Sequence, residues 1–574
     1  MKATRIPMIV MVLLSLAVVF SFGISSVSAD VYVSTTGNDS WDGSSATWVS
    51  GTIGPKLTIK NATGTATSGG TVRIANGTYN ENGISITSKT LTVIGDNRDG
   101  TIINGGKTGR IFTVGGTGTF TFANLTFLNG NASTGQGGAI SSYQGTALIV
   151  DNCTFINNTA GPNGGAISSN YNPLTVTNCN FINNRAGSGA GWGGAILAMG
   201  GGFSVPITIT GNNFVNNSGG SGGALYLSYG SATIQFNRFI GNTPNTAQID
   251  ADTFASVNAD LNWWGSNAGP SGLVTSRIPV NSWLVLNVTA NPAAVKSGGT
   301  STISANLLYD NGILTDPGNP DFYYHDPAFG HVPDGIPVTF ATTLGSINSP
   351  AFTVNGVASS ALGGLVSGVA DVSATLDSET LHTSVAIDNV PPTAIANPPG
   401  GVYSTDKLVT LTMSEPGTIY YTTNGSTPTT SSNVYTGPLT ISTTTTLKFL
   451  AVDLAGNLSP VYTQVYTIDK TPLTLITTNP KSGATGVSRT IPITLRFNKN
   501  IKVSINWSKI YVKNMTTGKL VAITPSISGN TLYIFMKSSR IGGNYYQVYI
   551  PPSAIKDAAG NNFTKGYLFG FRSA

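Results

Sequence analysis

The feature that most constrains the fold is a repeat in the first half of the chain. The segment Gly-Gly-Ala, followed by Ile or Leu, recurs with its second glycine at Gly138, Gly165, Gly194 and Gly223. These glycines are 27, 29 and 29 residues apart. Repeats of roughly 20 to 50 residues are typical of solenoids, in which a single unit buries its apolar face only against its neighbours. We therefore expect stacked coils of one repeated shape.

The pattern inside one unit predicts short strands separated by corners. Leu174 and Val176 alternate with polar residues, Asn178 interrupts the alternation, and Cys179 and Phe181 resume it. Apolar residues with period two indicate strands, and asparagine or glycine tolerates the left-handed backbone of a corner. The expected corner residues before the second strand are Asn124, Asn152, Asn178 and Gly211. Three strands and three corners per coil predict a right-handed parallel β-helix with coils about 4.8 Å apart.

Stacking also accounts for the scarcity of charge, since a ladder of like charges repels itself. Only 9% of residues are charged, against about 25% in ordinary domains. Between Ile111 and Gln248 the charged residues are Asp151, Arg185 and Arg238. Polysaccharide-cleaving enzymes need clustered carboxylates, and these three residues do not supply them.

Two carboxylate pairs remain near the ends of the repeat. We interpret Asp96 with Asp99, and Asp250 with Asp252, as turn and cap residues. The sequence therefore predicts no catalytic residue, no cofactor and no metal ligand, and favours a protein that is not an enzyme. A polysaccharide lyase or glycoside hydrolase on the β-helix is the alternative.

Residues 1–29 differ from the rest of the chain. Lys2 and Arg5 precede an apolar run that ends in a small-residue motif before Asp30, as in a secretory signal peptide. An uncleaved membrane anchor is the alternative. We expect an extracellular protein at the cell surface or cell wall, with no membrane span in the mature chain. N-x-S/T sequons such as that at Asn38 make it a candidate glycoprotein. Its scattered basic residues predict no nucleic-acid partner.

The segment 30–279 has distinct ends. A weakly helical stretch near residues 55–70 is expected to plug the first coil, and Trp263 and Trp264 in "NWWGSNAGPSG" are expected to cap the core at the other end. The entry coils resemble those of pectate-lyase-like β-helices. The whole segment resembles the β-helical region of adhesin-like surface proteins, especially those of methanogenic archaea. That resemblance implies the β-helix fold and a role at the cell surface.

The second half predicts three Ig-like β-sandwiches, because its strands alternate with period two between turn signals. Residues 280–390, with "DGIPVTF", resemble the bacterial Ig-like repeats of invasin-type adhesins. Residues 391–470, with "YYTTNGSTP" and "AVDLAGN", resemble the C-terminal domain of chitobiases and β-hexosaminidases, an accessory domain. Residues 471–574, with "NPKSGATGV" and "DAAGN", resemble an Ig-like domain of S-layer proteins. The fold class is thus all-β, a right-handed parallel β-helix followed by three Ig-like β-sandwiches.

Two sets of residues with potential chemistry receive a structural interpretation. Cys153 and Cys179 occupy the same place in consecutive coils, where we favour buried free thiols over a disulfide. His325, Asp326 and His331 lie in the segment from Asp321 to Asp334, which we interpret as a solvated loop. Metal binding by this loop is the alternative, since it has the highest density of polar residues in the chain.

Aromatic residues near the Gly-Gly-Ala segments provide the candidate ligand contacts, and the alternative is that they merely cover the loops. They are Tyr143, Tyr171, Trp192, Tyr226 and Tyr229. Aromatic faces beside amides and hydroxyls suit sugar rings or a protein surface, and they require no titrating group. The sequence thus predicts an adhesin-like or cell-envelope protein that recognises a cell-wall or surface polysaccharide, or a surface protein of a partner cell. A wall carbohydrate-binding module acting through the chitobiase-type domain is a further alternative.

Overall fold

The computed structural model describes residues 30–143, 145–187, 191–202, 204–244, 247–312 and 324–574. The signal-peptide prediction for residues 1–29 lies outside the described residues. Contacts divide the chain into two units. The first contains residues up to 291, 302–363 and 370–384, and the second contains residues 292–301, 364–369 and 385–574.

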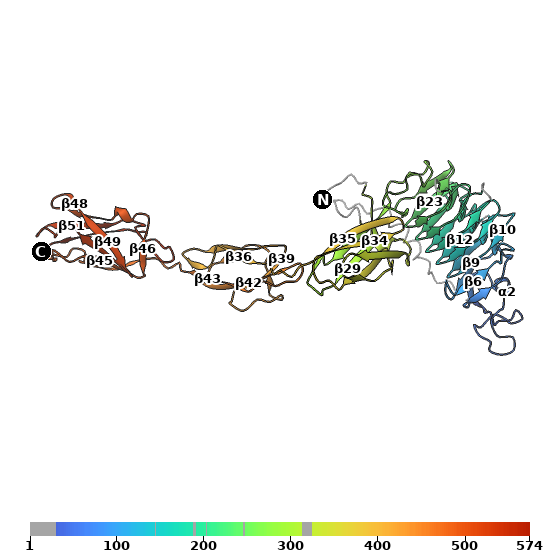
Figure 1. Cartoon of the computed structure of the whole chain (residues 1–574), viewed down its shortest axis with the longest axis horizontal. Helices are drawn as coiled ribbons and strands as arrows, with labels where there is room; N and C mark the ends of the chain where they lie inside the picture. Colours follow the sequence, from blue (N-terminus) through green and yellow to red (C-terminus); the bar gives the residue numbers. More distant parts are fainter. Residues whose placement is uncertain (1–29, 144, 188–190, 203, 245–246, 313–323) are drawn as a thin grey trace. The chain divides into compact units, whose positions relative to one another are not determined.

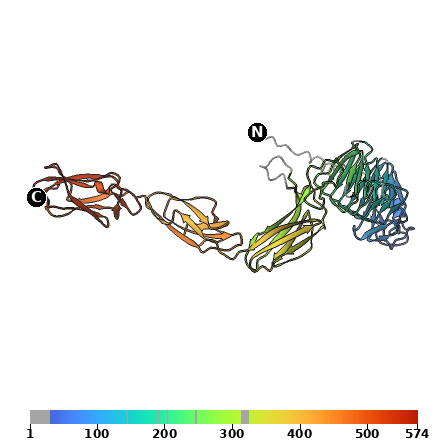
Figure 2. The same ribbon diagram turned by 45° about the horizontal axis from the view of Figure 1, so that its top comes forward.

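A solenoid of parallel strands makes up residues 31–258, and its coils lie one upon another (Figures 1 and 2). The nine-stranded sheet is, in spatial order, β1 (Val31–Val33), β2 (Gly70–Ile74), β5 (Leu91–Gly95), β8 (Gly118–Ala123), β12 (Thr146–Asp151), β16 (Leu174–Thr177), β20 (Pro206–Thr210), β23 (Gly230–Gln235) and β26 (Ala255–Asn258). The second sheet is β4 (Ile84–Thr87), β7 (Phe112–Gly115), β11 (Ile140–Tyr143), β15 (Ile167–Asn170), β19 (Ile196–Met199), β22 (Leu225–Ser228) and β25 (Ile249–Ala251). The third is β3 (Gly77–Tyr79), β6 (Thr101–Asn104), β9 (Thr126–Leu128), β13 (Thr154–Ile156), β17 (Asn180–Ile182), β21 (Asn213–Val215) and β24 (Arg238–Ile240).

The solenoid also contains a fourth, narrow sheet that the three-strand prediction missed. It consists of β10 (Asn131–Ala132), β14 (Thr159–Ala160) and β18 (Arg185–Ala186). These strands are only two residues long, so no alternation of apolar residues marks them in the sequence.

The corners and the core follow the sequence pattern. Asn124, Asn152, Asn178 and Gly211 all have positive φ, between 48° and 67°. Inside the coils, Phe127, Phe155, Phe181, Phe214 and Phe239 stack in order with ring centroids 4.7 to 5.0 Å apart. Identical rings in identical coils therefore repeat at the spacing of parallel strands.

Both ends of the solenoid are closed as predicted. The helix α2 (Ile59–Thr65) begins after Thr58, whose side chain accepts a hydrogen bond from the amide of Asn61. It buries Ile59 and Ala62 in the core. At the other end, Trp264 stacks on Phe239 with centroids 4.9 Å apart and joins the core. Trp263, the other residue expected to cap the core, is fully buried outside that core cluster, and its indole donates a hydrogen bond to Asp377.

The first sandwich continues the first unit. One sheet contains β27 (Leu284–Asn291), β29 (Ser301–Asp310), β33 (Val357–Gly363) and β31 (Ser346–Ile347), and the other β35 (Glu379–Ile387), β34 (Val369–Leu376), β30 (Pro337–Thr342) and β32 (Ala351–Phe352). A 3-10 turn, η2 (Pro327–Phe329), precedes β30. In the second unit, β28 (Ala294–Val295) pairs with the end of β35 at Ala386 and Ile387.

The second unit contains the last two sandwiches. The sheets of one are β36 (Ala394–Asn397), β38 (Lys407–Met413) and β41 (Leu439–Ile441), and β37 (Gly401–Tyr403), β43 (Tyr462–Ile468), β42 (Thr445–Asp453), β39 (Gly417–Thr422) and β40 (Asn433–Val434). The other sandwich has three sheets in its described residues. The first is β44 (Leu475–Asn479), β45 (Ile493–Phe497), β50 (Thr531–Met536) and β49 (Ile523–Ser528), and the second is β46 (Ile501–Val503) and β52 (Ile555–Asp557). The third is β48 (Lys519–Val521), β47 (Tyr511–Asn514), β51 (Tyr545–Ile550) and β53 (Tyr567–Arg572), and the 3-10 turn η3 (Trp507–Lys509) lies between β46 and β47. The predicted fold class is confirmed.

Candidate functional site

The five predicted contact residues lie at the two ends of the strands of one solenoid sheet, the sheet from β4 to β25. Trp192 precedes β19, and Tyr226 is the second residue of β22. Tyr143, Tyr171 and Tyr229 lie at or just after the last residues of β11, β15 and β22. The repeat thus places the five residues toward the two ends of the strands of one sheet.

Trp192 and Tyr226 form a pair across neighbouring coils. Their ring centroids are 4.9 Å apart and their planes differ by 15°. Trp192 is 41% exposed, and its backbone amide is fixed by the side-chain oxygen of Asn163 at 3.0 Å. Stacked rings on a repeated backbone lose little conformational entropy when a ligand binds.

The other three aromatic residues lie at the opposite strand ends. Tyr229 stacks on Phe254, a residue that the sequence analysis did not single out, with ring centroids 4.8 Å apart and planes within 4°. Tyr143 and Tyr171 are 41% and 54% exposed. Their rings lie on Gly115 and Gly201, where a β-carbon would come within 3 Å of the ring. Because glycine has no β-carbon, each ring packs directly against the backbone at these two positions.

Two acidic residues lie beside these aromatic residues in the last coil. Asp250 is the register neighbour of Tyr226, and burial, together with Asp250 and Asp252, raises the pKa of the Tyr226 hydroxyl. Asp252 accepts hydrogen bonds from the Ser228 hydroxyl and the amide of Phe254. Asp252 thus acts as a turn cap, as its position in the sequence predicted.

The charged residues of the repeat are also bound into the fold. Asp151 accepts from Thr177 and Asn178, at 2.7 and 3.1 Å, and Arg185 donates to the carbonyl of Gly187. Arg238 forms an ion pair with Asp377, which also accepts from the Trp263 indole at 2.7 Å. Asp151 is the one carboxylate among these three residues, so they supply no carboxylate pair.

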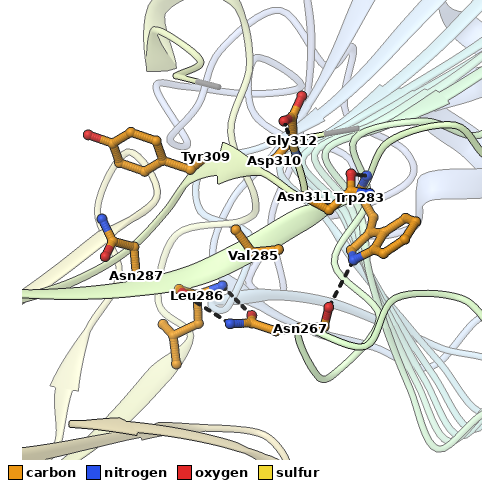
Figure 3. A pocket seen from close by; sticks show the side chains of 9 residues that line it. All are labelled: Asn267, Trp283, Val285, Leu286, Asn287, Tyr309, Asp310, Asn311 and Gly312. Atoms are coloured by element: carbon orange, nitrogen blue, oxygen red, sulfur yellow. Dashed lines mark hydrogen bonds between the residues drawn. The ribbon is translucent and has the colours of Figure 1, made fainter. Parts of the chain in front are cut away.

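A cavity with a volume of about 760 Å³ lies in the described part of the first unit (Figure 3). Its lining is Asn267, Trp283, Val285, Leu286, Asn287, Tyr309, Asp310, Asn311 and Gly312. The Trp283 indole donates to the Asn267 carbonyl, and the Asn267 amide exchanges two hydrogen bonds with the Leu286 backbone. These groups already form hydrogen bonds within the protein, so they are not free to bind a ligand in the cavity.

The histidine loop does not form a cluster in its described part, residues 324–334. His325 contacts Asp310 at 3.2 Å, whereas His331 contacts the Val332 carbonyl at 2.7 Å. Asp326 caps the turn η2 through the amide of Ala328. Asp321 lies outside the described residues. Three described carboxylates that approach one another closely lie elsewhere, in the second unit: Asp388, Glu415 and Asp453. Glu415 belongs to none of the motifs recognised in the sequence.

Cys153 and Cys179 are buried free thiols, as predicted. The Cys179 sulfur lies 3.3 Å from the Cys153 amide, and its thiol donates to the Thr177 carbonyl at 3.0 Å. Burial raises the pKa of the Cys179 thiol well above its usual value. Among the described residues, no helix is both apolar and long enough to cross a bilayer.

Family comparisons match three regions of the chain. Residues 398–463 match the chitobiase/beta-hexosaminidase C-terminal domain, and residues 469–573 match a bacterial Ig-like domain. Residues 152–170 and 178–199 match the repeat of the Chlamydia polymorphic membrane protein. The first match agrees with the resemblance inferred from the sequence, and the second confirms a bacterial Ig-like domain there, whereas its S-layer type stays a prediction. A search of curated proteins gave no significant match.

Parts of the chain are similar to solved structures at low identity. A C-terminal fragment of intimin, solved with the translocated intimin receptor, is 16% identical and covers 35% of this chain and 68% of its own, with a TM-score of 0.16. Yersinia pseudotuberculosis InvD is 15% identical over 50% of this chain and 98% of its own, with a TM-score of 0.21. Invasin, a bacterial integrin-binding protein, is 14% identical over 51% of this chain and 60% of its own, with a TM-score of 0.19.

Proposed function

We propose that this is a secreted, non-catalytic surface protein of the adhesin-like kind, whose β-helix recognises a surface glycan or the surface of a partner cell. The observation that carries the proposal is the stacked pair of Trp192, which is exposed, and Tyr226, which is partly buried. Aromatic rings that are large, rigid and half-exposed are the usual anchors of recognition surfaces. The match of the coils to a repeat of a polymorphic membrane protein supports a location at the cell surface.

The pair offers apolar contact and hydrogen bonding together. One face of each ring is covered by the other ring, so a ligand meets the outer faces and the exposed edges. Asp250, beside Tyr226, supplies carboxylate oxygens that accept hydrogen bonds from sugar hydroxyls. This combination suits a neutral polysaccharide better than an acidic one, since the carboxylate repels uronate groups.

The chitobiase-type and bacterial Ig-like domains fit an accessory role in such a protein. Their cores are apolar, and each domain comprises two or more small sheets in the described residues. We infer that they display the β-helix or contribute to attachment. Origin in a methanogenic archaeon remains a prediction from the sequence resemblance.

The test measures retention and cleavage together. The purified protein is incubated with neutral wall polysaccharides and with pectic or uronic glycans, with and without calcium. We expect retention on a neutral glycan or on intact partner cells without new reducing ends or unsaturated products. Product formation above background would refute the non-catalytic proposal and favour the lyase or hydrolase.

Single substitutions then locate the contact. Trp192→Ala and Tyr226→Ala are each expected to weaken retention by about 30-fold, the effect of losing a central anchor of about 2 kcal/mol. Trp48→Ala is the matched control, because Trp48 is 57% exposed but lies in a loop near the first coil. Equal weakening by all three variants would show that the Trp192 and Tyr226 pair is not the site, and retention confined to the chitobiase-type domain would favour the wall-module alternative.

A further inference from the structure

Two turns of one construction occur in the second unit, each where a sandwich binds the segment that precedes it. In the first, which we call the 453 turn, Asp453 Oδ1 accepts from the Asn457 amide at 2.8 Å. The Asn457 side chain donates to Asp453 Oδ2 and to the carbonyl of Asp388, both at 2.8 Å. Asp388 itself accepts from the amide of Val390 at 2.8 Å. The turn therefore holds the chain that enters the sandwich.

The second, the 557 turn, repeats these bonds. Asp557 Oδ1 accepts from the Asn561 amide at 2.8 Å, and the Asn561 side chain donates to Asp557 Oδ2 at 2.9 Å and to the carbonyl of Asp469 at 2.7 Å. Asp469 accepts from the amide of Thr471 at 3.0 Å. Asp388 thus corresponds to Asp469, and Asp453 corresponds to Asp557.

A hairpin beside each turn fixes a third correspondence. The Ser414 amide donates to the Thr393 carbonyl, and the Thr393 amide donates to the Ser414 hydroxyl, both at 2.9 Å. Asn498 and Thr474 exchange the equivalent pair at 3.0 and 2.9 Å. The next residue in each hairpin is therefore equivalent, and these residues are Glu415 and Lys499.

At the 557 turn, the equivalent position supplies a cation. The Lys499 ammonium bonds Asp469 at 2.7 Å, Asp557 at 2.8 Å and the carbonyl of Thr471 at 2.6 Å. The ammonium thereby neutralises two carboxylates that the turn brings together.

At the 453 turn, the same position supplies a third carboxylate. Oxygen atoms of Asp388, Glu415 and Asp453 all lie within 4.8 Å of one another. Burial, and then repulsion by Asp388 and Asp453, raise the pKa of Glu415. Lys296 lies beside Gly456 in the turn, but forms no ion pair within 4.0 Å with these three described carboxylates. The position that holds a cation in one turn is therefore surrounded by negative charge in the other.

We propose that Asp388, Glu415 and Asp453 bind a calcium ion in the place that the Lys499 ammonium takes at the 557 turn. Calcium binds oxygen atoms at about 2.3 to 2.6 Å, so oxygens up to roughly 4.8 Å apart reach one ion together. Magnesium demands a stricter octahedron and is usually held by only one or two carboxylates, so a set of three carboxylates suits it less well. The ion ties the segment at Asp388 to the sandwich that carries Glu415 and Asp453.

The test titrates the full chain, stripped of metal, with calcium chloride in an isothermal calorimeter. We expect one site with a Kd of about 0.1 to 1 mM, the range of extracellular calcium modules. Glu415→Lys copies the residue at the equivalent position, so it is expected to fold normally and abolish the binding heat. Asp406→Asn, in the same sandwich, removes an exposed carboxylate away from the turn and is expected to leave binding unchanged.

Three results would overturn the proposal: no saturable calcium binding, binding that Glu415→Lys leaves intact, or binding that appears only in Lys296→Met. The last result would mean that Lys296 is the cation of this turn. Should Glu415→Lys fail to fold, Glu415→Gln removes the charge with little change of shape. This variant is expected to weaken calcium binding by about tenfold, and unchanged affinity would refute the site.

Discussion

Asn184 is a buried asparagine whose side chain links three consecutive coils of the solenoid, and its replacement should destabilise the whole stack. Its Oδ1 accepts from the backbone amide and from the side-chain amide of Asn158, both at 3.0 Å. Its Nδ2 donates to the carbonyl of Phe155 and to Oδ1 of Asn217, both at 3.0 Å. Because Asn184 is fully buried, water does not replace these partners in the folded state.

Asn184→Ala leaves two buried donors without partners, the Asn158 backbone amide and one hydrogen of the Asn158 side chain, and the Phe155 carbonyl loses its side-chain donor. A buried polar group without a partner costs about 1 to 3 kcal/mol. Near the middle of that range, the two together cost about 4 kcal/mol. The neighbouring Asn183 is the matched control, since it has φ of 56° and an exposed side chain. Glycine adopts that φ without strain, so Asn183→Gly should change the stability little.

Hydrogen exchange followed by mass spectrometry is the appropriate assay, because it reports opening of the solenoid separately from that of the sandwiches. Amides of β13, β17 and β21 should exchange about a thousand times faster in Asn184→Ala, since 1.4 kcal/mol corresponds to a factor of ten. A change below tenfold, or an equal change in Asn183→Gly, would refute the argument that the inner asparagine ladder stabilises the coils.

Three further predictions concern groups whose pKa is shifted. Cys153 and Cys179 should be silent in thiol titration of the folded protein and appear as two thiols on unfolding, because burial keeps the Cys179 thiol protonated; reactive thiols before unfolding, or none afterwards, would contradict this. The bonds of Lys499 lower the pKa of Asp469, and they also lower the pKa of Asp557 against the opposing effect of burial. Since folding depresses both values, the stability they provide is present above pH of about 4 and lost as pH falls through the folded values. The Tm of the C-terminal sandwich should therefore fall in acid, and Lys499→Met should lower the Tm at pH 7 and flatten its dependence on pH; an unchanged profile would refute the role of the bridge. Burial and nearby acids raise the pKa of Tyr226, so its hydroxyl stays protonated and glycan retention should be constant from about pH 6 to 9; a loss of retention centred below pH 9 would show that another group controls binding.

The sequence alone determined the fold class, because in a solenoid the local pattern and the global structure obey the same rule. Each coil must match its neighbour, so the sequence pattern repeats where the coils repeat and stops where they end. This pattern marks the ladder of Phe155 and Phe181, the corner at Asn152 and the cap at Trp264. The strands β10, β14 and β18 escaped prediction because two residues carry no periodicity.

The contacts between residues distant in the chain were decided only by the tertiary structure. Tyr229 and Phe254 are separated by 24 positions of unremarkable sequence, yet their rings lie 4.8 Å apart because one full coil separates them. Glu415 belongs to no motif, and becomes notable only when the turn at Asp453 and the segment at Asp388 bring two more carboxylates beside it. Electrostatic energy depends on the distance between charges in space. Inside a repeat, the spacing along the chain predicts that distance, but it does not do so for the separate strands and linkers of a sandwich.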